Sequence, residues 1–342
     1  MFLGARRRFP LLIVLLLFTL KPLRAETSDA KFEKEACRKS PSFDLKKWTG
    51  TQASYESYLE YDYVGQASTN LGNGHNRPID ENYLDVRHQF VRHTLLAFLV
   101  QIGIEYQHLG FGVPNDALIP DRLDSLVSNI ALDTRWSEND LLHFQWHPGL
   151  YTDFRGSGGD AFHTPMDVGY THVSSRRFQW IVGFSYNRWR STPFLGAAGF
   201  RWQITPRWKL KLYLPTPDIE FAARPDLTLL LGADVRGDSY RVGPHFGDSK
   251  GIPKLNNAFV DYQEVRVGPG FSWNVRPLIE VNLMAGYMVG RQYNFHDSDI
   301  KLNGSGAPFV NLTIHALFKL PGEPLRILQR NQMSFGDLFK YF

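Results

Sequence analysis

Apolar and polar residues alternate along most of this chain with a period of two. Residues 199–215 read GFRWQITPRWKLKLYLP: apolar side chains such as Trp202 take every second position, and Arg201, Lys209 and Lys211 take positions between them. The stretch TPR interrupts the alternation once. Because successive side chains on a strand point to opposite faces, this pattern predicts a two-stranded hairpin with one apolar and one charged face.

The same alternation continues from Thr51 almost to Pro321 in about 14 segments, most of them roughly 9–13 residues long. This is close to the length that a tilted membrane-spanning strand needs. An amphipathic helix needs about 12 residues with a period of 3.6, and no such segment is evident before Pro321. The sequence therefore predicts an all-β chain.

Short and long connections between these segments alternate along the chain. The long connections are predicted at residues 64–83, 108–121, 151–165, 188–195, 236–257 and 292–306. One position breaks the rule, because only Pro215-Thr216-Pro217 stands where a long connection is expected. In a closed up-and-down barrel all turns of one parity lie at one end, and outer-membrane barrels have short turns at the periplasmic end. A sandwich with Greek-key connections gives no reason for this sorting.

Tryptophans flank the short connections, and they are Trp136, Trp202, Trp208 and Trp273. Barrels carry aromatic side chains at the membrane–water boundary. A soluble protein with this pattern would expose wide apolar strips or bury unpaired basic side chains, and both are unfavourable. We therefore expect residues 51–320 to form a closed antiparallel up-and-down transmembrane β-barrel, of about 14 strands within a range of about 12 to 16, with its apolar face toward lipid.

The first 25 residues predict a signal peptide that is removed on export. A basic cluster, Arg6 to Arg8, precedes an apolar run, Phe9 to Leu20, that is too short to span a bilayer comfortably. Five of the 38 Lys and Arg residues, and no Asp or Glu, lie in residues 1–25, so the rest of the chain carries 33 basic and 34 acidic residues. The basic isoelectric point thus gives no reason to expect nucleic-acid binding.

The ends of the barrel region are expected to lie in the periplasm. Residues 26–50 are polar and aperiodic and predict a leader or linker, which contains the only cysteine, Cys37. A single cysteine excludes an intramolecular disulfide. Residues 321–342 are expected to form a C-terminal periplasmic tail. The expected location is the bacterial outer membrane, with outer-membrane lipid and the barrel-assembly machinery as partners; the oligomeric state is left open.

Four segments carry a family resemblance, and they read IEYQHLGF (104–111), PDRLDSL (120–126), HPGLYTDF (147–154) and DLTLLLGADVRGDSYRVG (226–243). With them, the chain from about Ser54 to Phe318 resembles an uncharacterised, porin-like bacterial family of outer-membrane β-barrels, classified as a domain of unknown function. The resemblance implies location and architecture, and it implies no substrate. The last expected strand, VNLTIHALF, is similar to the aromatic-ended assembly signal of such proteins, although 24 residues follow Phe318.

The polar faces supply candidate lumen-lining residues for binding or selectivity, and they are Arg201, Lys209, Lys211, Glu220, Asp234, Glu264 and Glu280. Opposed basic and acidic strips would create a transverse field that orients polar solutes, and rings of charge set ion preference. The same residues could instead neutralise one another in cross-strand pairs that stiffen or close the lumen. The sequence leaves both arrangements open.

Catalytic and metal chemistry find little support. His172 lies close to Ser174 and Ser175, but no third member of a catalytic set is evident. His143 and His147 are two pleats apart on one strand face, about 13 Å, which is too far to share a metal ion. We therefore expect no catalytic site, no metal and no cofactor.

The sequence favours a porin-like channel that passes small polar solutes through a charged lumen. Two alternatives are compatible with the same strands: a closed structural or binding barrel that acts through its long extracellular loops, and an outer-membrane hydrolase that uses His172. Bilayer conductance separates the first two, and loss of an activity on changing His172 but not Lys209 would favour the third.

Overall fold

Strands make up nearly all of the regular structure. The computed structural model describes residues 53–72, 76–93, 98–156, 159–175, 177–276 and 278–319. The strands are β1 (Ala53–Asn70), β2 (Asn76–His93), β3 (Phe98–Phe111), β4 (Arg122–Arg135), β5 (Asp140–Trp146), β6 (Gly149–Thr152), β7 (Phe162–His163), β8 (Met166–Val173), β9 (Phe178–Tyr186), β10 (Phe194–Gln203), β11 (Trp208–Tyr213), β12 (Asp218–Arg224), β13 (Leu227–Arg241), β14 (Phe259–Arg276), β15 (Ile279–Phe295), β16 (Ile300–Gly304) and β17 (Ala307–Lys319). Single-turn 3₁₀ helices lie in the connections: η2 (Gly159–Ala161), η3 (Asp248–Lys250), η4 (Pro253–Leu255) and η5 (His296–Ser298).

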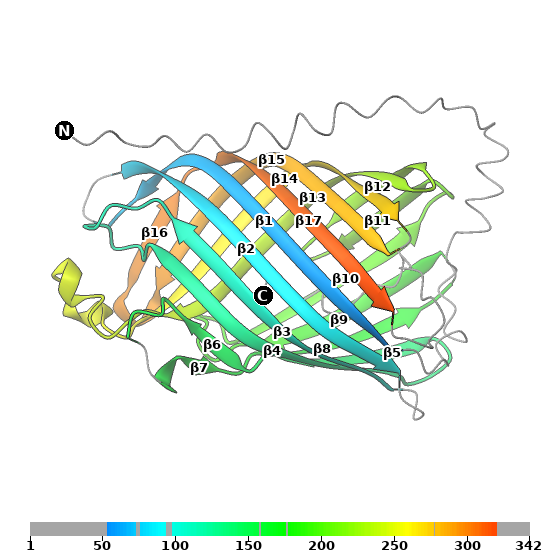
Figure 1. Cartoon of the computed structure of the whole chain (residues 1–342), viewed down its shortest axis with the longest axis horizontal. Coiled ribbons are helices and arrows are strands. Elements are labelled where there is room, and N and C mark those ends of the chain that lie inside the picture. Colours follow the sequence, from blue (N-terminus) through cyan, green and yellow to red (C-terminus); the bar gives the residue numbers. More distant parts are fainter. Residues whose placement is uncertain are drawn as a thin grey trace.

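The strands form one closed antiparallel barrel. Each pairs with its neighbours in chain order, and β1 closes the circle by pairing with β17, from Ser54 opposite Lys319 to Val64 opposite Phe309. Three strands of the wall are each divided into two segments. β5 and β6 form one of them, because both pair with β4, and β7 and β8 form the next, because β7 pairs with β6 and β8 pairs with β5. β16 and β17 form the third, because both pair with β15. The wall therefore has 14 strands, which run obliquely around it (Figure 1). The prediction of an all-β, 14-stranded closed barrel is confirmed.

Most connections sort by length as predicted. One end of the barrel, which we call the short-turn end, holds the connections before β3, β5, β9, β11, β13 and β15. Strand β1 begins at this end and β17 ends at it. The connections before β2, β4, β7, β10, β12, β14 and β16 lie at the other end, the long-loop end. The longest of them is residues 242–258, between β13 and β14. Two are short exceptions of four residues each: residues 214–217 before β12 and residues 296–299 before β16.

Several predicted long loops are wrong in their bounds. Residues 64–83 and 292–306 were expected to be loops, but β1 continues to Asn70 and β15 to Phe295, and Thr69 still pairs with Arg77. Residues 108–121 and 236–257 likewise shorten to 112–121 and 242–258. The reason is that Gln66, Ser68 and Asn70 are exposed polar residues. The apolar alternation stops there, while the hydrogen-bonded ladder of the backbone continues.

The two faces of the wall differ in polarity. In the opening hairpin Trp202 and Leu212 are 44% and 45% exposed, whereas Arg201 and Lys209 are 7% and 8% exposed. The same division runs around the barrel, with Ile102, Leu132, Phe144 and other apolar side chains exposed. Trp136, Trp202 and Trp208 are exposed beside the short-turn end. The apolar face of the hairpin therefore points outward and its charged face inward.

Three expected segments lie outside the described residues: the signal peptide at 1–25, the leader at 26–50 with Cys37, and the tail at 321–342. Among the described residues, no helix is long and apolar enough to cross a membrane.

Candidate functional site: the charged inner wall

Two lysines on β11 pair with two carboxylates on β12. In the sheet register Lys209 stands opposite Glu220, and Lys211 stands opposite Asp218. Lys211 Nζ lies 3.1 Å from Asp218 Oδ2, and both lysines contact the Glu220 carboxylate. Arg201 on β10 is opposite Lys211 and is buried. The hairpin charges therefore lie beside acids of the next strand, which is the arrangement of a cross-strand ladder.

A double-mutant cycle tests this ladder. Lys209→Met removes one cation from Glu220, and Glu220→Gln removes the carboxylate that both lysines share. We expect the double variant to lose less stability than the two single variants together, by about 0.5–3 kcal/mol, because groups in one ion-pair network are coupled. The folded fraction in a urea titration measures each free energy of unfolding. Additive losses would show that Lys209 and Glu220 act independently.

A second and more deeply buried network joins three arginines from three consecutive strands. Arg236 on β13 contacts Glu60, Asp62 and Asp234. Arg266 on β14 lies 2.9 Å from Asp62, 3.3 Å from Glu81 and 2.6 Å from Glu264. Arg291 on β15 lies 3.0 Å from Glu81 and also donates to the Thr69 hydroxyl and the Ile79 carbonyl. The side chains of Arg266, Asp62 and Glu81 have no solvent exposure.

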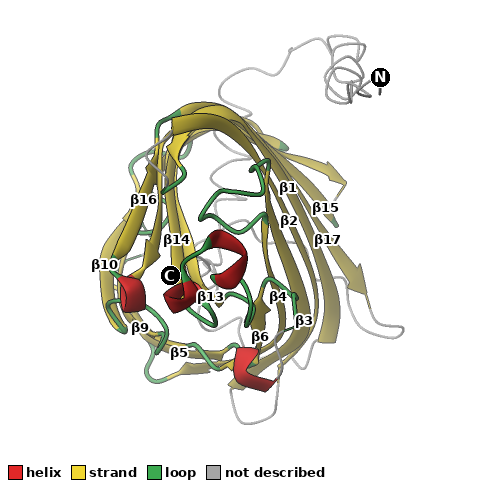
Figure 2. Ribbon diagram, turned by 90° about the vertical axis from the view of Figure 1, so that its left-hand side faces the viewer, coloured by secondary structure: helices red, strands yellow, loops and turns green. Residues whose placement is uncertain are grey.

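These contacts are made across the interior of the barrel. Arg266 lies on β14 and Asp62 on β1, with β15 and the β16–β17 strand between them in the wall. At about 4.8 Å per strand, the two residues are about 14 Å apart along the sheet. A contact of 2.9 Å between Arg266 and Asp62 therefore bridges a tightly curved part of the wall. The end view shows that the wall of the barrel has an elongated cross-section (Figure 2).

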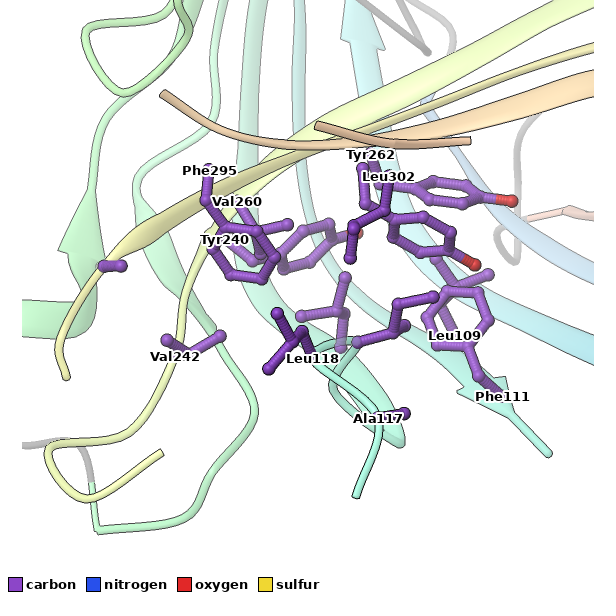
Figure 3. Packing of buried hydrophobic residues seen from close by; sticks show 14 of the residues in the cluster. Leu109, Phe111, Ala117, Leu118, Tyr240, Val242, Val260, Tyr262, Phe295 and Leu302 are labelled. Atoms are coloured by element: carbon purple, nitrogen blue, oxygen red, sulfur yellow. The ribbon is translucent and has the colours of Figure 1, made fainter. Parts of the chain in front are cut away.

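Buried apolar side chains fill the barrel beside this network, toward the long-loop end. We call this cluster, formed around Phe111, Leu118, Leu255, Tyr262 and Tyr293, the apolar plug. Leu118 and Leu255 come from the loops 112–121 and 242–258, and the three rings come from β3, β14 and β15 and contact one another. Figure 3 shows Phe111, Leu118 and Tyr262 within this cluster. The Tyr262 hydroxyl donates to Glu81 at 2.6 Å, so the plug and the arginine network are in direct contact.

The longer plug loop is held in shape by polar contacts at its exposed end. The Asn256 amide donates to the Asp248 carboxylate at 2.8 Å, and the Asp248 backbone N–H donates to the Asn256 side chain at 3.0 Å. Hydrogen bonds from Asn256 and His245 hold the pKa of Asp248 below its ordinary value. These contacts fix the turn that carries Leu255 into the barrel.

The structure separates the seven predicted lining residues into three groups, all on the inward face. Arg201, Lys209, Lys211 and Glu220 lie together on β10–β12. Asp234 and Glu264 belong to the arginine network. Glu280 accepts a hydrogen bond from Ser272 at 2.6 Å, near the short-turn end.

Sequence reasoning missed Glu60, Asp62, Glu81, Arg236, Arg266 and Arg291 as members of one network. Period-two alternation was a signal that Asp62 and Arg236 point inward. Whether these two side chains contact each other depends on the curvature of the wall, which cannot be predicted from the sequence of a single strand. Glu81 lay in a segment that was expected to be a loop.

The histidines considered as catalytic or metal-binding candidates each contact a neighbouring carboxylate. His172 Nδ1 lies 2.8 Å from Asp140, which is the partner that sequence reasoning did not find. The Ser175 hydroxyl accepts hydrogen bonds from the backbone N–H groups of Arg177 and Phe178, and no hydrogen bond joins it to His172. His143 contacts Asp133, and His147 contacts Asn129 and Asp167. No group of three or more His, Cys, Asp or Glu side chains in the described part of the chain is arranged to hold a metal ion.

A protein-family model described as "Domain of unknown function (DUF6268)" matches residues 84–307, which is more than half of the chain. No curated protein matches the sequence.

Solved structures with a similar arrangement of strands include an outer membrane channel from Pseudomonas putida F1, with 10% sequence identity, a TM-score of 0.45, and coverage of 79% of this chain and 98% of that chain. They also include the Pseudomonas putida toluene transporter TodX, with 8% identity, a TM-score of 0.40, and coverage of 81% of this chain and 92% of that chain. The KdgM porin has 6% identity and a TM-score of 0.30, with coverage of 76% and 98%.

Proposed function

We propose that this chain, which belongs to the family "Domain of unknown function (DUF6268)", is a bacterial outer-membrane channel. Its charged inner wall conducts small polar solutes. Its long-loop end is closed in this structure. The observation that carries this proposal is the polarity of the wall. A closed antiparallel barrel with exposed Leu, Ile, Phe and Trp outside and buried Arg, Lys, Asp and Glu inside suits lipid outside and a polar interior.

The closed end follows from the buried contacts. The apolar plug and the arginine network occupy the interior toward the long-loop end, and Arg266 and Glu81 are out of contact with solvent. Passage of a solute therefore requires the loops 112–121 and 242–258 to move. The same observation favours a second candidate function, a permanently closed barrel that binds partners through its long loops.

Two measurements in sequence test these functions. Electrophoretic mobility with and without boiling reports whether the chain in an outer-membrane fraction is a closed, detergent-resistant barrel. Conductance across a planar bilayer then separates the candidates. Discrete conductance steps support the channel, whereas a heat-modifiable barrel that never conducts supports the closed binding barrel. A single mobility in a soluble periplasmic fraction would contradict both.

A charge on the outer wall is expected to be costly. Ile102 is 53% exposed and stands opposite Ile130, in the middle of the apolar band on β3 and β4. Ile102→Arg should destabilise the folded barrel by about 2–4 kcal/mol in lipid, the cost of an arginine near the bilayer midplane. The adjacent inward residue provides the control: Gln101 lies 2.9 Å from Asp133, so Gln101→Arg places its charge beside a carboxylate. Urea titration of both variants in lipid vesicles measures the difference, and equal losses would argue against a lipid-facing outer wall.

A further inference from the structure

A tyrosine, a histidine and an aspartate form a polar cluster on the outer wall near the long-loop end. Tyr106 and His108 are two residues apart on β3, and His108 stands opposite Asp124 on β4. The Tyr106 hydroxyl donates to Asp124 Oδ1 at 3.0 Å, and His108 Nδ1 lies 2.7 Å from the same oxygen. Leu126, two residues along β4 from Asp124, is 46% exposed, so this is the outward face; Asp124 itself is 2% exposed and is the buried partner of the Tyr106 and His108 side chains. We call these three residues the upper cluster.

The same three residue types recur on the outer wall near the short-turn end. Tyr170 and His172 are two residues apart on β8, and His172 stands opposite Asp140 on β5. The Tyr170 hydroxyl donates to Asp140 Oδ1 at 2.5 Å, and His172 Nδ1 lies 2.8 Å from that oxygen. Both rings pack against Trp180 on β9. We call Asp140, Tyr170 and His172 the lower cluster.

The two clusters point in opposite directions along the barrel. β3 runs toward the long-loop end, so His108 lies beyond Tyr106 on that side. β8 runs toward the short-turn end, so His172 lies beyond Tyr170 on the other side. In each cluster the tyrosine ring is therefore nearer to the middle of the wall, and the ionisable pair is nearer to the barrel end. This is the orientation of a phenol that sits in hydrocarbon with its hydroxyl at a polar boundary.

The distance between the clusters matches a bilayer. Arg135 on β4 pairs with Leu141, so Asp140 lies about 12 residues along β4 from Asp124. At about 3.3 Å per residue and a strand tilt of about 35–45°, this corresponds to about 30 Å along the barrel axis. The hydrocarbon core of a bilayer is about 30 Å thick. Between the clusters, Ile104 and Leu132 are exposed apolar residues.

We propose that the two Tyr–His–Asp clusters are the contacts of this barrel with the lipid headgroup layers, and that they fix its height in the membrane, with the hydrocarbon confined between them. This inference rests on the proposed outer-membrane location. The upper cluster offers headgroups the His108 ring and the neighbouring Arg122, whose side chains are 31% and 42% exposed. The lower cluster offers the His172 ring, also 31% exposed.

Thiol accessibility tests where the boundaries lie. In a Cys37→Ser background, single cysteines replace Arg122 and Glu138, just outside the clusters, or Ile104 and Leu132, between them. The barrels are folded into dioleoylphosphatidylcholine vesicles, with an anionic maleimide on both sides of the membrane. We expect cysteines at 104 and 132 to react at least about tenfold more slowly than those at 122 and 138, because a charged reagent is excluded from hydrocarbon.

Bilayer thickness tests what the clusters do. The variant His108→Phe with Asp124→Leu makes the apolar band of the outer wall taller by one row of residues. Its folding yield should therefore be highest in phosphatidylcholines whose acyl chains are longer than those that are optimal for the unmodified barrel. The matched control is His143→Phe with Asp133→Leu, a His–Asp contact on the inward face of neighbouring strands. It should fold less well but keep the same optimal chain length.

The outcomes separate this inference from the proposed function. If no bilayer yields a heat-modifiable form, the outer-membrane barrel and the headgroup contacts both fail. If the barrel folds but positions 104 or 132 react as fast as 122, or the outward and inward variants shift the optimum equally, only the headgroup assignment fails.

Discussion

Replacing Arg266 with leucine is expected to be among the most destabilising single substitutions in this barrel. Arg266 contacts Asp62, Glu81 and Glu264, and its side chain is fully buried. Removal of one partner of a buried ion pair costs about 3–5 kcal/mol, because the remaining charge stays in a poorly solvated site. Here the carboxylates left behind also repel one another. The measurement is the free energy of unfolding from a urea titration of the heat-modifiable form.

A surface ion pair provides the matched control for Arg266→Leu. Arg224 and Asp226 lie 3.4 Å apart beside a short turn, and each side chain is 46% exposed. Arg224→Leu should change stability by less than about 1 kcal/mol, the usual worth of a solvated pair. If Arg266→Leu costs no more than Arg224→Leu, water reaches the arginine network and the network cannot hold the barrel closed.

Opening the apolar plug is expected to have the largest effect on solute passage. Leu118 and Leu255 are 4% and 0% exposed and bring the loops 112–121 and 242–258 into the barrel. In the double variant Leu118→Asp with Leu255→Asp, burial of two unpaired carboxylates is unfavourable, so the loops should leave the interior. We expect the conductance, and the swelling rate of vesicles in a small neutral sugar, to rise several-fold.

The control for the plug variant changes the same loop at an exposed position. Asn115 is exposed, so Asn115→Asp adds a charge to loop 112–121 without entering the plug. Its conductance should equal that of the unmodified protein. If the double Asp variant is folded and heat-modifiable but conducts no better than Asn115→Asp, the plug is not what closes the barrel.

The alternation of residues 199–215 was sufficient to predict which side chains of this hairpin face inward. Trp202 and Lys209 lie on opposite faces as expected, because side-chain direction on a strand is a local property with a period of two. The number of strands and the sorting of the connections were also predictable, since each strand must cross the same thickness and reverse at one of two ends.

The limits of local reasoning are clear at β1 and β2. Thr69 and Arg77 remain paired, although the outward residues around them are polar. Apolar alternation depends on which outward side chains are apolar, whereas strand pairing depends on backbone hydrogen bonds, so the two end at different residues. For the same reason Glu81 was assigned to a loop and did not appear among the candidate lining residues.

The sequence by itself determined the β-barrel class, the outward and inward faces of each strand, and the presence of charge on the inner face. Only the tertiary structure decided which charges meet. Lys209 and Glu220 pair because their strands are neighbours in register, whereas Arg266 reaches Asp62 and Glu81 because the wall curves and brings β14 opposite β1 and β2. Curvature of a closed sheet depends on all of its strands together, so no single segment of the chain encodes that contact.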